Sequence, residues 1–148
     1  MCIRDSIKID RSKPSTSATG VPGGWVNAPV TVGLHATDNL SDIDSTYYAV
    51  DGAVTGTQGS TVTVGAEGVH TVRYWSVDKA GNTEDAQSFT LRIDLSSPSI
   101  TPSQSPARNG NGWNNTDVVV SFACEDQTEL SGLKDLSLIH ISEPTRPY

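Results

Sequence analysis

The stretch "AEGVHTVRYWSVDKAGNTE", Ala66 to Glu84, decides the fold. In "HTVRYWSVD" every second residue projects to the same side, with Val72, Tyr74 and Ser76 on one face. A period of two is that of a β-strand with one buried face. The following "DKAGN" predicts a turn in which Asp78 caps backbone N–H groups, Gly81 takes a positive φ and Asn82 tolerates one.

Similar alternating runs recur on both sides of this strand, separated by Gly, Pro, Asn and Asp, and no segment has sustained helical periodicity. The predicted strands lie in "VTVGLHATD", "STYYAVDG" with an Asp51-Gly52 turn, "STVTVGAEG" and "QSFTLRID", with a weaker one near Ser15–Thr19. The predicted inward residues are Val30, Val32, Leu34, Ala36, Val62, Val64, Phe89, Leu91 and Ile93. About seven such strands predict an all-β sandwich of two packed sheets.

The chain also repeats itself. "IKIDRSKPS" (7–15) returns as "LRIDLSSPS" (91–99), an offset of 84 residues, and "GWVNAPVTVGLHATD" (24–38) returns as "GWNNTDVVVSFACED" (112–126), an offset of 88. Self-similarity at a fixed period indicates a tandem array. We therefore expect a complete repeat over residues 7–94 and the N-terminal part of a second over residues 95–135, with Val118, Val120 and Phe122 unusually exposed.

The two ends differ from the rest. "LSLIHI" (136–141) can be written CTG TCT CTT ATA CAC ATC, whose reverse complement in another frame encodes Met-Cys-Ile-Arg-Asp, as in the initial "MCIRDS". Both ends resemble read-through of a sequencing adapter. We interpret residues 1–6 and 136–148 as adapter-derived, exclude them from fold reasoning, and expect the natural protein to extend past both ends.

Composition restricts the function. The formal net charge is −7, without the clustered Lys and Arg that nucleic-acid binding needs. No apolar run approaches the roughly 20 residues of a membrane span. Cys2 falls in the excluded N-terminal segment, so we expect no Cys2–Cys124 disulfide. Few charges and abundant Gly, Ser, Thr and Val suit a secreted β protein.

At "YYAVDG", "AEGVHTVRYWSVDKAGNTE" and "IDLSSPSIT" the sequence resembles the bacterial immunoglobulin-like (Ig-like) repeats of large secreted and cell-surface proteins. The resemblance implies an immunoglobulin-like or fibronectin-III-like sandwich in an extracellular or cell-surface protein, with neighbouring Ig-like repeats as its partners. In sister repeats a second Cys often follows the Ser-Gly-Leu stretch, which implies that Cys124 has lost a disulfide partner. A small buried residue is the alternative.

Acidic loops provide the only metal candidates. Asp38, Asp42 and Asp44 share one loop, and Asp10 and Asp94 mark the joins between repeats. Clustered carboxylates suit Ca²⁺, although the EF-hand spacing is absent and an Asp in a turn commonly accepts a backbone N–H.

Aromatic residues provide the only ligand candidates. Trp75 should point outward, either to stack on a sugar or to pack beside a cross-strand neighbour. We expect one of Tyr47 and Tyr48 in the core. Trp25 and its counterpart Trp113 should begin strands and cover the end of the sandwich. His35 and His70, without metal-ligand spacing, are expected to be solvated or hydrogen-bonded.

The sequence contains no recognisable catalytic motif and predicts no enzyme, cofactor or nucleic-acid partner. The expected function is that of a non-catalytic extracellular spacer, stalk or adhesion module in a larger bacterial protein. One alternative is a module of a secreted hydrolase that binds carbohydrate or a surface polysaccharide or protein. The other is an adhesin repeat made rigid by calcium.

Overall fold

A computed structural model describes residues 7–127 and 129–133, which form two compact units divided between Leu95 and Ser96. The described residues contain strands and no helix, so none of them can form a membrane-spanning helix. The ends that we interpret as adapter-derived, 1–6 and 136–148, lie outside the described residues.

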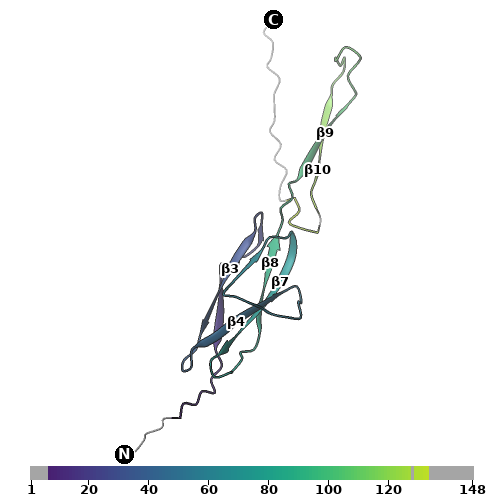
Figure 1. The fold of residues 1–148 in the computed structure, drawn as a ribbon. Coiled ribbons are helices and arrows are strands. Elements are labelled where there is room, and N and C mark those ends of the chain that lie inside the picture. The colour runs from purple at the N-terminus through teal and green to yellow at the C-terminus, as the bar shows by residue number, and fades with distance from the viewer. Residues whose placement is uncertain (1–6, 128, 134–148) are drawn as a thin grey trace, which may run out of the picture. The chain divides into compact units, whose positions relative to one another are not determined.

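Unit 1 (residues 7–95) consists of two sheets (Figure 1). The three-stranded sheet has the order β1 (Ser15–Thr19), β3 (Val30–Thr37) and β6 (Thr61–Val64). The five-stranded sheet has the order β2 (Trp25–Val26), β8 (Gln87–Ile93), β7 (Gly68–Asp78), β4 (Ile43–Val50) and β5 (Thr57–Gln58). All pairs are antiparallel except β2 with β8.

The predicted alternation is present on both sheets, and the inward residues form one core between them. Val32, Val72 and Leu91 are fully buried, while Arg73 on the outer face of β7 is exposed. The buried cluster comprises Val30, Val32, Leu34, Val62, Val64, Val72, Tyr74, Leu91 and Ile93. Ala36 and Phe89, also predicted to point inward, are half-buried. Two sheets sharing an apolar core are consistent with a β-sandwich.

Six of the eight strands in unit 1 match the predicted alternating runs, and the other two are short. The two-residue strands β2 and β5 carry no alternation long enough to recognise in sequence. Strand β2 pairs Trp25 with Arg92, and β5 pairs Gln58 with Tyr47. The Asp51-Gly52 turn is present, and both residues have positive φ, 51° and 76°.

A buried carboxylate connects the two sheets at the end of unit 1 where β7 stops. Glu84 accepts hydrogen bonds from the backbone N–H of Thr16 (3.0 Å) on β1 and of Ser76 (2.8 Å) on β7. The Thr16 hydroxyl donates to the same carboxylate, and Oγ of Thr16 and Ser76 are 2.7 Å apart. The sequence pattern did not reveal this polar layer.

Unit 2 is described as an antiparallel pair, β9 (Ser99–Ser105) and β10 (Val119–Glu125). Its apolar residues are exposed, as predicted: Val118 is 39%, Val120 56% and Phe122 44% exposed. The prediction for Trp113 is wrong. Trp113 lies in the connection between β9 and β10 and is 73% exposed. Its N–H donates to Asn109 Oδ1 and its carbonyl accepts from the Asn109 N–H, and it does not begin a strand.

Candidate functional site

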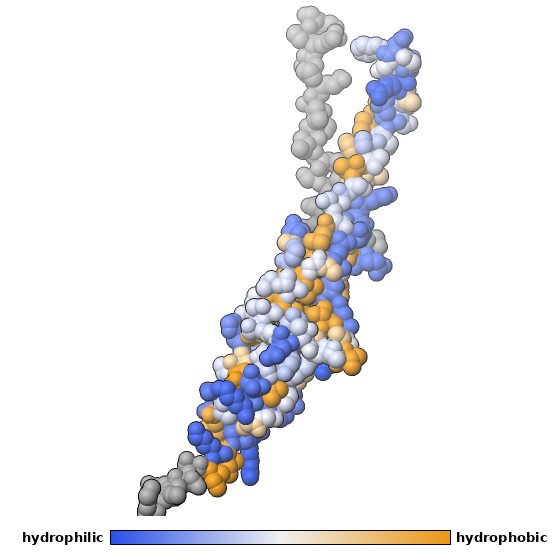
Figure 2. All heavy atoms as spheres, viewed as in Figure 1, coloured by the Kyte–Doolittle hydropathy of each residue, from blue (hydrophilic) through white to orange (hydrophobic). Residues whose placement is uncertain are grey.

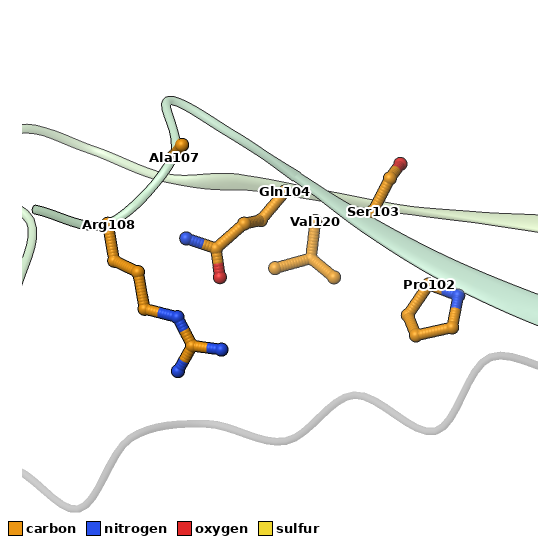
Figure 3. Close-up of a pocket in the computed structure, with 6 residues that line it drawn as sticks. All are labelled: Pro102, Ser103, Gln104, Ala107, Arg108 and Val120. Carbon is orange, nitrogen blue, oxygen red and sulfur yellow. The ribbon is translucent and has the colours of Figure 1, made fainter. Parts of the chain in front are cut away.

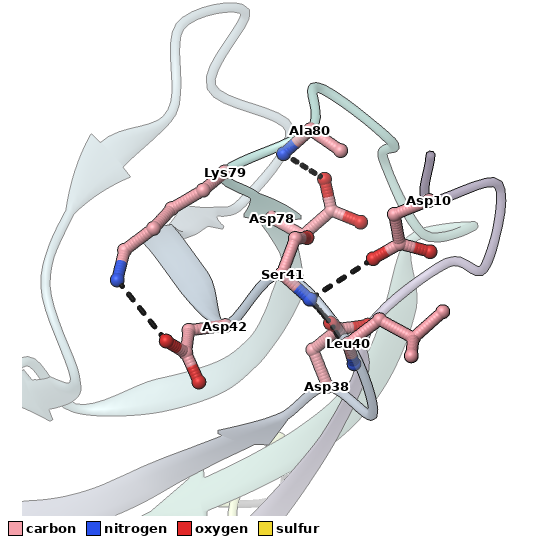
Figure 4. Close-up of polar contacts among 8 residues, drawn as sticks. All are labelled: Asp10, Asp38, Leu40, Ser41, Asp42, Asp78, Lys79 and Ala80. Carbon is pink, nitrogen blue, oxygen red and sulfur yellow. Dashed lines mark hydrogen bonds and ion pairs between the residues drawn. The ribbon is translucent and has the colours of Figure 1, made fainter. Parts of the chain in front are cut away.

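Three carboxylates converge at the end of unit 1 where the chain leads into β1 (Figure 4). Asp10 precedes β1, Asp38 follows β3 and Asp78 is the last residue of β7. One carboxylate oxygen from each lies within 4.8 Å of the others. Strand pairing therefore brings together acidic groups that are far apart in the sequence.

Backbone N–H groups hold Asp10 and Asp38 in place. Asp38 Oδ2 accepts hydrogen bonds from the N–H of Leu40 (3.0 Å) and Ser41 (2.8 Å). The N–H of Ser41 also donates to Asp10 Oδ2 at 3.1 Å, which joins the segment before β1 to the β3–β4 loop. Hydrogen bonding from Leu40, helped by Ser41, holds the pKa of Asp38 below its ordinary value, against the opposing effect of desolvation.

Asp78 caps the turn after β7, as predicted. Its Oδ1 accepts from the N–H of Ala80 (2.9 Å) and Asn82 (2.8 Å), and its Oδ2 accepts from Asn82 Nδ2 (2.8 Å). Burial alone would raise the pKa of Asp78, but these hydrogen bonds lower it below the ordinary value. Gly81 has the predicted positive φ of 89°. Asn82 does not share it and instead contributes its side chain.

The predicted trio of Asp38, Asp42 and Asp44 does not form a common site among the described residues. Asp42 has a φ of 65° and pairs with Lys79 at 3.3 Å, with both side chains mostly exposed. Asp44 accepts a hydrogen bond from Ser45 Oγ at 3.0 Å. Asp42 lies in the turn before β4 and Asp44 on β4 itself, and neither belongs to the carboxylate cluster around Asp38. Asp10 and Asp78 take their places.

The acidic cluster has the chemistry of a site for a hard cation. Carboxylate oxygens are ligands that Ca²⁺ prefers. Asp38 Oδ1 and Ser41 Oγ are buried and have no hydrogen-bond partner among the described residues. A groove of about 700 Å³ lies beside the cluster, lined by residues 7–10, 40–42, Lys79 and Ala80. Oxygen atoms at the cluster are therefore without a hydrogen-bond partner among the described residues, and the adjacent groove is open to solvent.

The aromatic residues on the five-stranded sheet do not form a flat platform. Tyr47 and Trp75 are direct cross-strand partners, and their rings stack with centroids 5.8 Å apart. Gly56 packs against Trp75 so closely that a Cβ there would lie 2.6 Å from the indole. Tyr48 packs against the core. Trp75 is thus half-buried between neighbours, which is the packing alternative considered for it.

The two candidate His residues have structural surroundings. His35 is exposed on β3. His70 Nδ1 lies 2.7 Å from Asp51 Oδ2, and its Nε2 lies 3.0 Å from the carbonyl oxygen of Ala66. Hydrogen bonding to Asp51 raises the pKa of His70 and lowers the pKa of Asp51.

Trp25 begins β2, as predicted, and is half-buried. Cys124 on β10 is half-buried and forms no disulfide with any residue that the structure describes. The loss of a partner for Cys124 remains a prediction.

No protein-family model, curated protein or solved structure matches the chain.

Proposed function

We propose that the chain is a non-catalytic Ig-like repeat that acts as a spacer or adhesion module in a larger secreted or cell-surface protein. The observation that carries the proposal is that the chain enters unit 1 at one end of its long strands and leaves at the other, with both joins held by hydrogen bonds. Such a unit holds its neighbours apart and needs no chemistry of its own.

The N-terminal join is held by the acidic cluster. The segment around Asp10 is bonded to the β3–β4 loop through Ser41 N–H and to the turn after β7 through Asn82 Nδ2, which donates to the Asp10 carbonyl at 3.4 Å. Lys13 adds an exposed ion pair with Asp85 at 3.0 Å. These contacts reduce the freedom of the segment that precedes β1.

The C-terminal join is held at the opposite end of β7. Strand β8 ends at Ile93 beside Gly68, the first residue of β7. The N–H of Asp94 then donates to the Val26 carbonyl at 2.9 Å, and the N–H of Leu95 donates to Glu67 Oε2 at 3.1 Å. Strand β7 has 11 residues, which at about 3.3 Å per residue gives unit 1 a span of roughly 35 Å.

Small-angle X-ray scattering of chains carrying two, three and four tandem copies of residues 7–94 tests the spacer function. A stiff spacer adds a constant increment to the maximum dimension with each copy. Growth with the square root of the copy number would indicate freely jointed units and contradict the proposal. In a matched series with Asp10→Ala in every copy, the maximum dimension should increase less with each added copy, because the N-terminal join is loosened.

A second candidate function is a spacer stiffened by Ca²⁺ bound to Asp10, Asp38 and Asp78. It is supported by the convergence of the three carboxylates and by the buried Asp38 Oδ1, which accepts no hydrogen bond from any residue that the structure describes. Calcium should then raise the melting temperature of the chain and EDTA should lower it, because a ligand that binds only the folded state stabilises it. Asp38→Asn should abolish the response and Asp44→Asn should preserve it. A melting temperature unaffected by calcium and EDTA rejects this candidate.

A further inference from the structure

The sequence repeat is also a structural repeat, because the pairing of β9 with β10 repeats the pairing of β1 with β3. In unit 1, Ala18 faces Leu34. The sequence offsets of 84 for the first strand and 88 for the second convert this pair into Pro102 and Phe122, which are partners in unit 2. The other pairs of β1 with β3 convert in the same way. The two hairpins therefore have the same register.

The side chains also alternate in the same sense in the two hairpins. In unit 1, Val32 is buried in the core and Thr19 is exposed. Their counterparts in unit 2 are Val120 and Ser103. Figure 3 shows Val120 pointing to one side of the hairpin, beside a groove of about 360 Å³, and Ser103 to the other. Figure 2 shows apolar residues along the same hairpin. Residues related by these offsets therefore hold equivalent places in the two repeats.

The offset of 84 places Asp94 at the position of Asp10. The segments "IKIDRSKPS" (7–15) and "LRIDLSSPS" (91–99) share an Ile-Asp pair at this point. In a tandem array with this period, the residue that ends one sandwich is also the residue that leads into the next. The chain shows this aspartate in both positions, after β8 at Asp94 and before β1 at Asp10.

At the end of a sandwich, the aspartate is held through its backbone. Strand β2 pairs with β8 as far as Val26 and Ile93. The N–H of Asp94, which is 5% exposed, continues this pairing by donating to the Val26 carbonyl at 2.9 Å. The N–H of the next residue, Leu95, donates to Glu67 Oε2 at 3.1 Å. Both donors are backbone groups, so these contacts do not depend on the side chains that follow β8.

At the start of a sandwich, the aspartate is held through its carboxylate and its carbonyl. Asp10 Oδ1 accepts a hydrogen bond from the N–H of Ser12 at 2.8 Å, and Oδ2 accepts one from the N–H of Ser41 at 3.1 Å (Figure 4). The Asp10 carbonyl accepts from Asn82 Nδ2 at 3.4 Å. The N–H used at the end of a sandwich and the acceptors used at the start are separate groups, so the two sets of contacts do not compete.

We propose that a single aspartate serves two sandwiches at each boundary of the array. Its N–H donates to β2 of the preceding copy, and its carboxylate accepts from the β3–β4 loop of the following copy. The boundary then has no linker segment between the two sets of contacts, whereas the reach of a flexible linker grows with its length. This inference rests on the proposed tandem spacer and identifies the joint between its repeats.

The test uses a chain in which residues 1–94 are followed directly by residues 11–148, so that Asp94 of the first copy precedes Arg11 of the second. Amide hydrogen exchange is measured by NMR at this boundary Asp94 and at Ser41 of the second copy. We expect both N–H groups to be protected. Asp94→Ala in the first copy should speed exchange at the second Ser41 by about 2–10-fold, because that N–H retains only Asp38 as an acceptor. The boundary N–H should stay protected, because the Val26 carbonyl remains.

Two variants calibrate this response. Asp10→Ala in the original chain should speed exchange at Ser41 by the same factor, because the same N–H loses the same acceptor. Lys13→Ala in the second copy is the matched control, since its side chain is 55% exposed in an ion pair with Asp85, and it should leave exchange at Ser41 unchanged. If the first copy does not fold with Asp94→Ala, Asp94→Asn should still speed exchange at Ser41, because an amide oxygen accepts more weakly than a carboxylate.

The outcomes separate this inference from the spacer function. Residual dipolar couplings of the two-copy chain report whether the copies align as one body. Exchange at the second Ser41 that ignores the boundary substitution overturns the shared aspartate, even if the copies align together and the spacer function stands. An unprotected boundary N–H overturns it as well. The expected response with independently aligned copies supports the shared aspartate and contradicts a stiff spacer.

Discussion

Replacing Glu84 with Ala should be among the most destabilising changes in unit 1, because this buried carboxylate bonds to both sheets. It accepts from the N–H of Thr16 on β1 and the N–H of Ser76 on β7. All three residues are buried. Without the carboxylate, two backbone donors from different sheets lose their acceptor in a place that is closed to water.

The magnitude follows from those two donors. Leaving a buried N–H unsatisfied costs about 1–3 kcal/mol, so Glu84→Ala should lower the free energy of unfolding by roughly 2–6 kcal/mol. The hydroxyls of Thr16 and Ser76 add little, because they lie 2.7 Å apart and can bond to each other. Glu84→Gln keeps one acceptor oxygen and should cost about half as much.

Urea unfolding followed by circular dichroism measures the loss as a lower midpoint at an unchanged m value. Asp85→Ala is the matched control. Its side chain is 97% exposed in an ion pair with Lys13, so removing it should change stability by less than about 0.5 kcal/mol. If Glu84→Ala folds and loses less than about 1 kcal/mol, the carboxylate does not hold the two sheets together.

Two further predictions concern His70 on β7 and Gly56, which packs against Trp75 on the same strand. The raised pKa of His70 means that its ion pair with Asp51 stabilises the fold fully below pH 6.5 and less as the pH rises through the folded-state pKa. The free energy of unfolding should therefore decrease by less than about 1 kcal/mol on going from slightly acidic to alkaline pH, and a decrease that persists in His70→Asn would rule out this origin. Gly56→Ala should cost about 1–3 kcal/mol and alter indole fluorescence, because its Cβ would overlap Trp75. Gly24→Ala, where a Cβ meets nothing within 4 Å, should be neutral, and equal stabilities of the two variants would contradict the overlap.

The strands and the core of unit 1 could be predicted because alternation along a strand is a local property. Each of β3, β6, β7 and β8 has its apolar residues two apart, and this spacing determines which side chains face the core whatever the strand pairs with. The Asp78 cap was equally predictable, since its partners lie within four residues. The exposure of Val120 followed from the repeat, because its counterpart in unit 1 needs covering strands that lie beyond β3 in the sequence.

The tertiary structure decided what depends on contacts between distant segments. Sequence proximity grouped Asp38 with Asp42 and Asp44, but strand pairing places Asp38 beside Asp10 and Asp78. Glu84 was unremarkable in the sequence, since its role requires β1 and β7 to meet. The misplacement of Trp113 has the same origin, because its counterpart Trp25 is half-buried in a strand that pairs with β8. The sequence by itself determined which face of each strand is apolar, since that depends on residues two apart. Only the fold decided which polar groups share a site, because hydrogen bonds and charges act between residues that chain order does not place together.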